Sequence, residues 1–100
     1  MKNYIITYSL RDFDRNYMDF YRAIEDNVDE YRHITETAWI VKTGKTAKEL
    51  RDILMPFMTF EDRSCDMLFI ADIGKDCDGM IAKSYWPFIK EEKEDESEGF

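Results

Sequence analysis

The fold is decided at residues 3–10, which read NYIITYSL. β-Branched and aromatic residues fill this stretch, and they favour an extended strand. Tyr4 and Tyr8 fall on one face of that strand, while Ile5 falls on the other. A strand with water on one face alternates apolar with polar residues. The stretch therefore predicts a strand in a sheet whose two faces are both covered.

Four further elements are expected along the chain. Apolar residues recur at helical spacing within residues 15–28, which predicts a helix. Residues 34–42 predict a single second strand, and residues 65–72 predict a third. Between those strands, Thr46 and Glu49 have the spacing of a capping box, so a second helix is expected to begin there.

The last structured segment has two interpretations. Residues 80–85 could form a short fourth strand, or Ser84 could cap a final helix that carries Trp86 and Phe88. A fourth strand would bring the strands to the number found in the order βαββαβ, which is the order of elements that we expect. The expected class is therefore α+β, a ferredoxin-like sandwich with an antiparallel-type four-stranded sheet and two helices on one face.

Length and charge limit the organisation and the partners. The 100 residues suit one domain, which we place at residues 1–90. Residues 91–100 form an acidic tail, which is expected to be disordered because its charges repel. The chain holds 22 acidic and 14 basic residues, for a formal net charge of −8. This balance disfavours nucleic acid as a partner, although it does not exclude it, and favours a protein with a basic surface.

Two further features bear on the compartment. No apolar run approaches the roughly 20 residues needed to cross a bilayer, so no membrane association is expected. The two cysteines, Cys65 and Cys77, are too few for a disulfide scaffold. The sequence therefore predicts a cytoplasmic protein.

The second apolar face of the sheet needs a cover. A second copy of the chain is the economical candidate, because two-fold dimers are the commonest assemblies. The alternative is that residues 86–89 fold back over the sheet. For the homodimer, the expected interface residues are Tyr4, Ile6, Tyr8, Trp39, Leu68 and Ile70.

Three stretches of the chain resemble a known family. Residues 4–10 read YIITYSL, residues 37–43 read TAWIVKT, and residues 46–52 read TAKELRD. Together they resemble the SinR-like relatives of the small CRISPR-associated adaptation subunit, a ferredoxin-fold endoribonuclease family. The resemblance covers roughly residues 3–72. It implies a ferredoxin-like protomer that pairs sheet against sheet, and either metal-dependent nuclease activity or a purely architectural role.

The family pattern usually places an aspartate at the end of the first strand. Ser9 occupies this active-site position here. A serine hydroxyl carries no negative charge and is a poor ligand for Mg²⁺. No catalytic residue is therefore assigned.

Other carboxylates could supply a metal site. If residues 3–10 and 65–72 lie side by side and parallel, their carboxyl ends share one edge of the sheet. Asp12 and Asp72 would then lie close together as candidate ligands for a hard cation. The plainer alternative is that these aspartates cap a helix and close a turn. No cofactor is expected unless the protein is a nuclease, in which case Mg²⁺ or Mn²⁺ is required.

The sequence favours a non-catalytic homodimeric interaction protein on a scaffold like that of the CRISPR adaptation subunit. One form of this hypothesis is a phage-type acidic inhibitor of a nucleic-acid-binding defence protein. The alternative is a metal-dependent endonuclease of the same fold, acting on RNA or DNA.

Overall fold

The computed structural model describes residues 1–10, 17–58, 66–74 and 76–90. Its elements, in chain order, are β1 (Lys2–Ser9), α1 (Tyr17–Asn27), β2 (Glu30–Thr35), β3 (Ala38–Thr43), α2 (Ala47–Leu54), the 3-10 turn η1 (Met55–Phe57), β4 (Met67–Asp72) and α3 (Tyr85–Lys90). The predicted α+β class and the βαββαβ order are confirmed, with α3 added at the end, although the fourth strand comes from the hairpin at residues 30–43 and not from residues 80–85. The proposed acidic tail, residues 91–100, lies outside the described residues.

The sheet has four strands in the order β2-β3-β1-β4, and every neighbouring pair is antiparallel. The expectation that residues 3–10 and 65–72 run parallel is therefore wrong. Tyr4 pairs with Asp72 at one end of β1, and Ser9 pairs with Met67 at the other.

The reversal arises from residues 30–43, which form a β-hairpin where one strand was expected over residues 34–42. Each helical crossover preserves strand direction, whereas a hairpin reverses it. The extra strand thus turns β4 antiparallel to β1. The turn at Glu36 and Thr37 contains no glycine, proline or asparagine, so its sequence gives little turn signal.

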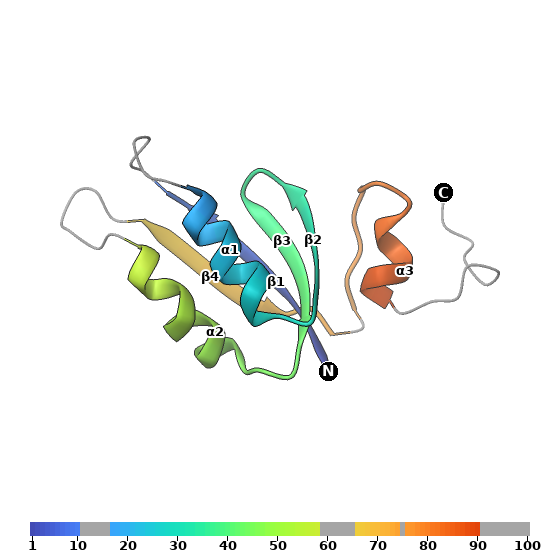
Figure 1. Ribbon diagram of the computed structural model, residues 1–100. Coiled ribbons are helices and arrows are strands. Elements are labelled where there is room, and N and C mark those ends of the chain that lie inside the picture. Colours follow the sequence, from blue (N-terminus) through green and yellow to red (C-terminus); the bar gives the residue numbers. More distant parts are fainter. Residues whose placement is uncertain (11–16, 59–65, 75, 91–100) are drawn as a thin grey trace.

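Helices α1 and α2 lie together over one face of the sheet (Figure 1). The main core fills the space between them and the strands. Phe20 and Ile24 of α1 meet Leu50 and Leu54 of α2 in this core. Its remaining buried members are Tyr4, Ile6, Tyr8, Leu10, Ala23, Trp39 and Val41.

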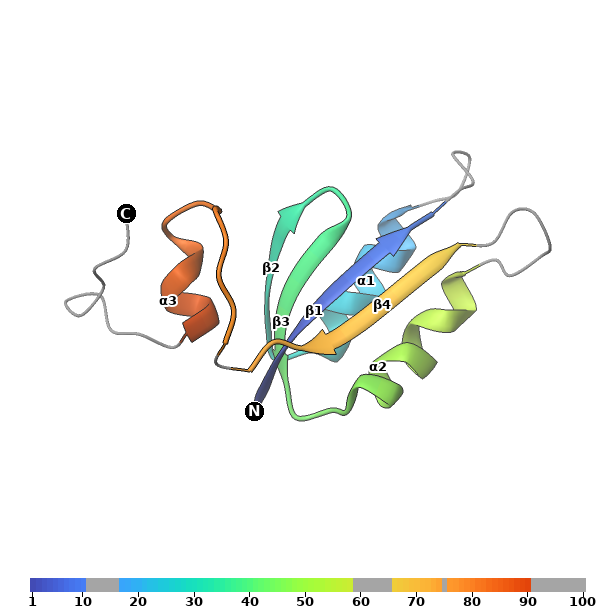
Figure 2. The ribbon, with the colours of Figure 1, turned by 180° about the vertical axis from the view of Figure 1, so that it is seen from behind.

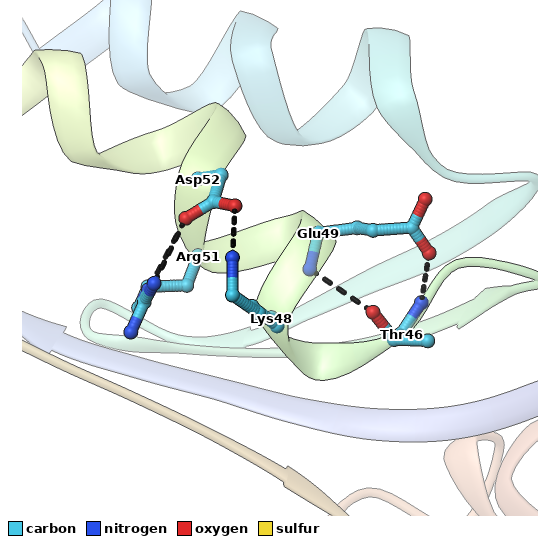
Figure 3. Close-up of polar contacts among 5 residues, drawn as sticks. All are labelled: Thr46, Lys48, Glu49, Arg51 and Asp52. Carbon is cyan, nitrogen blue, oxygen red and sulfur yellow. Dashed lines mark hydrogen bonds and ion pairs between the residues drawn. The ribbon is translucent and has the colours of Figure 1, made fainter.

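The start and end of α2 have local causes. Thr46 and Glu49 form the predicted capping box: the Thr46 hydroxyl accepts from the Glu49 N–H at 3.1 Å, and the Glu49 carboxylate accepts from the Thr46 N–H at 2.9 Å (Figure 3). Pro56 lies in the short 3-10 turn that follows, where it ends the α-helical hydrogen-bond pattern. In the described ranges, no helix is both long and apolar enough to cross a membrane.

Candidate interaction surface

The residues expected at a homodimer interface lie on the face that the helices cover. Tyr4, Ile6, Tyr8 and Trp39 are buried in the main core. Leu68 and Ile70 are half-buried and pack against the same core. This placement is a correction to the sequence analysis. Strand periodicity correctly grouped the six side chains on one face, but it could not tell which face the helices would cover.

The opposite face, here called the rear face, carries Ile5, Thr7, Ile40, Met67 and Phe69. Helix α3 lies on the β2 and β3 side of the sheet (Figure 2), where Trp86, Phe88 and Ile89 bury Ile40 and Ile5 of β1 borders the cluster. Residues 86–89 therefore fold back over the sheet, which is the alternative to a second copy that the sequence left open. No strand forms over residues 80–84.

Cationic side chains help to hold this terminal segment on the rear face. The Arg32 guanidinium lies 4.3 Å from the centre of the Phe88 ring, and the Lys42 ammonium lies 4.7 Å from it. Each cation is attracted to the ring quadrupole. In addition, the Asn3 side-chain amide donates to the Ile89 carbonyl, which joins α3 to β1.

None of the described helices covers the β4 side of the rear face. Phe69 is 64% exposed and Met67 is 62% exposed. Among the described strands, β4 has one hydrogen-bonded neighbour, β1, so its other edge faces outward. We call Met67, Phe69 and this outer edge the β4 surface. Burying a phenylalanine side chain fully is worth about 1.5–3 kcal/mol, so the open ring represents a substantial unused contact.

A hollow flanks β4 on each side. The hollow on the helix side, of about 250 Å³, is lined by Ala47, Lys48, Arg51, Leu68, Phe69 and Ile70. The hollow on the rear side, of about 270 Å³, is lined by Thr7, Tyr8, Ser9, Met67, Leu68 and Phe69. Leu68 and Phe69 border both hollows.

Ser9 is exposed at the end of β1, opposite Met67. It also borders a larger hollow of about 670 Å³, whose described lining includes Tyr8, Tyr17, Tyr21 and Glu36. Burial raises the pKa of the Tyr8 hydroxyl well above its ordinary value. That phenol therefore stays neutral at physiological pH and does not act as a base.

The metal site proposed at Asp12 and Asp72 depended on parallel strands, and the antiparallel pairing of β1 with β4 removes that basis. Asp72 is exposed beside Tyr4, at the opposite end of β1 from Ser9, and its carboxylate accepts from the Gly74 N–H at 2.9 Å. Asp12 lies outside the described residues. In the part of the chain that the structure does describe, no group of three or more His, Cys, Asp or Glu side chains is placed to hold a metal ion.

Comparisons with protein-family models, curated proteins and solved structures returned no match for this chain. The surface described above therefore carries the functional argument. Its two exposed residues, Phe69 and Met67, were not singled out from the sequence as interface residues. The only available signal was a strand that is apolar on both faces, and that signal does not show which part of a face stays open.

Proposed function

We propose that this protein is a non-catalytic interaction protein that acts as a homodimer. One observation carries the proposal: β4 is an outer strand that leaves Phe69 and Met67 about two-thirds exposed. Large side chains left open on a small domain mark interaction surfaces. The surface differs from the one expected from the sequence, but the physical reason is the same: apolar area on the sheet that the chain's own helices do not cover.

We assign no catalytic residue because Ser9 occupies the position where the resembled family has its aspartate. An exposed hydroxyl at the end of β1 supplies no charge to a divalent cation. The resemblance to the CRISPR adaptation subunit therefore supports an architectural role over a nuclease role. The α+β architecture agrees with that scaffold, and membership in the family remains part of the proposal.

The partner is proposed to be a protein with a basic surface. The formal charge of −8 on 100 residues favours such a partner and steers its approach at low salt. An acidic protein of this size could occupy the nucleic-acid site of another protein, as a phage-type inhibitor of a defence protein would. In a pull-down, the captured partner should be retained at low salt and released as salt rises. A partner retained equally at all salt concentrations would contradict this electrostatic account.

Light scattering tests the homodimer directly. We expect a solution mass of twice the 12.0 kDa protomer at micromolar to millimolar concentration. A monodisperse protomer throughout that range would overturn it.

The endonuclease alternative needs a separate assay, in which the purified protein is incubated with labelled RNA and DNA and with Mg²⁺ or Mn²⁺. We expect no cleavage that a chelator abolishes. Chelator-sensitive cleavage that is lost in Asp72→Ala but kept in Asp78→Ala, a matched exposed aspartate, would establish the nuclease instead.

A further inference from the structure

The two outer strands of the sheet differ in how well they resist pairing with another chain. The β2 strand carries exposed Glu30, Arg32 and His33, and its register to β3 shifts between His33 and Thr35. Charged side chains and irregular pairing are the usual means by which proteins block an edge. The β2 edge is therefore protected.

Residues 67–71 of β4 lack these protections. Residues 67–71 read MLFIA, with no charged residue and no proline. The register of β4 to β1 runs without a shift from Ser9–Met67 to Tyr4–Asp72. An apolar outer strand with a regular register offers a row of backbone groups to a second strand.

The two hollows indicate where an occupant would lie. One is on the helix side of β4 and the other on the rear side, and both reach Leu68 and Phe69. A protein that packed only on the rear face would fill one hollow. A strand placed beside β4 alternates its side chains between the two faces of the sheet, so it would contact Phe69 on the rear face and enter the hollow beside Leu68 and Ile70 on the helix face.

We propose that the occupant is β4 of a second copy, paired antiparallel across a two-fold axis near Phe69. This inference rests on the proposed homodimer and specifies its geometry. With the axis perpendicular to the sheet, odd-numbered residues of both copies share the rear face. Phe69 of one copy then lies beside Phe69 of the other, and cross-strand aromatic pairs stabilise such ladders. The product is a continuous eight-stranded sheet.

Charges on α2 favour a second copy over an unrelated strand. Lys48 and Arg51 line the hollow beside β4, and both contact the Asp52 carboxylate, each at 3.0 Å (Figure 3). The same two-fold axis would bring α2 of the two copies alongside each other in antiparallel orientation. Lys48 of one copy would then face Asp52 of the other. Because the helix carries both signs on this side, its charges match those of its own copy.

Sedimentation equilibrium on two matched variants tests the proposal. Phe69→Lys places like charges at the axis and removes the ring, so the dimer dissociation constant should rise about tenfold or more. Met80→Lys makes a similar change at a side chain that is 98% exposed and lies away from β4, so its dissociation constant should equal that of the parent. Both sites are exposed, and neither change should disturb folding.

Thiol cross-linking then tests the location of the axis. In a background with Cys65→Ser and Cys77→Ser, a short bifunctional thiol reagent should join Phe69→Cys protomers into dimers and leave Glu30→Cys protomers unlinked. A dimer that resists Phe69→Lys, or that cross-links through Glu30→Cys, would overturn edge pairing while leaving the homodimer intact. A parent protein that is monomeric throughout would overturn the homodimer itself.

Discussion

The Trp39 indole N–H donates a hydrogen bond to the Tyr8 hydroxyl at 3.0 Å, and both side chains are buried. The Tyr8 hydroxyl in turn donates to the Glu36 carbonyl at 3.0 Å. At the same end of β1, the Tyr8 N–H donates to the Thr37 carbonyl at 3.1 Å. One side chain thus joins β1 to β3 and to the turn of the β2–β3 hairpin.

Tyr8→Phe should lower the free energy of unfolding by about 1–3 kcal/mol, because it leaves the Trp39 N–H and the Glu36 carbonyl without this partner. Urea denaturation followed by tryptophan fluorescence measures the loss. Tyr31→Phe is the control, since Tyr31 is partly exposed and should tolerate the change within about 0.5 kcal/mol. Equal losses of unfolding free energy at the two positions would show that the buried hydrogen bonds of Tyr8 add no more stability than an exposed tyrosine hydroxyl.

The raised pKa of Tyr8 predicts a loss of stability in alkali. In the folded protein the buried phenol keeps its proton, whereas in the unfolded chain it ionises near the ordinary tyrosine pKa of 10.0. Above that pH the unfolded state binds fewer protons than the folded state, so the free energy of unfolding falls as pH rises. The stabilisation that the neutral Tyr8 phenol supplies is complete below pH 10 and declines above it. Urea denaturation at several alkaline pH values should show a shallower decline in Tyr8→Phe than in the parent, and parallel declines would contradict the assignment.

Thr46→Ala should destabilise the protein by about 1 kcal/mol, because it removes the hydroxyl that caps α2. Thr46→Ser keeps that hydroxyl and is the matched control; an equally unstable serine variant would refute the capping account.

The Thr46 backbone N–H holds the pKa of Glu49 below its usual value. The stabilisation that the ionised Glu49 carboxylate gives to the folded protein is therefore present above the pKa of Glu49 in the unfolded chain. It is lost as the pH falls through the pKa of Glu49 in the folded protein. Acid titration of helicity by circular dichroism should show this loss in the parent and not in Glu49→Gln.

Phe88→Ala should release α3 from the rear face. The ring packs in the cluster around Ile40 and contacts the Arg32 and Lys42 cations. Its removal should therefore lower the free energy of unfolding by about 3 kcal/mol. Hydrogen exchange over residues 85–90 and at Ile40 should accelerate in the variant. Met80→Ala, at a fully open side chain, should leave both exchange and stability unchanged. Unaltered exchange in Phe88→Ala would mean that the ring does not hold α3 in place.

Much of the fold could be predicted from local patterns. The capping box at Thr46 and Glu49 depends on residues three positions apart, so its spacing in the sequence already specifies its geometry. Strand periodicity is equally local, and it correctly placed Tyr4, Ile6 and Tyr8 on one face. The presence of apolar residues on both faces also correctly predicted that the sheet needs a cover beyond two helices.

The sequence by itself therefore determined both main helices, the first and last strands, the grouping of side chains into faces and the need for a second cover. Tertiary structure decided the direction of β4, because the hairpin at residues 30–43 added a strand that no local turn signal marked. It also decided that α1 and α2 cover Tyr4 and Trp39, and that α3 stops short of Phe69. Periodicity states which side chains share a face. Only the packing of distant segments determines what that face meets.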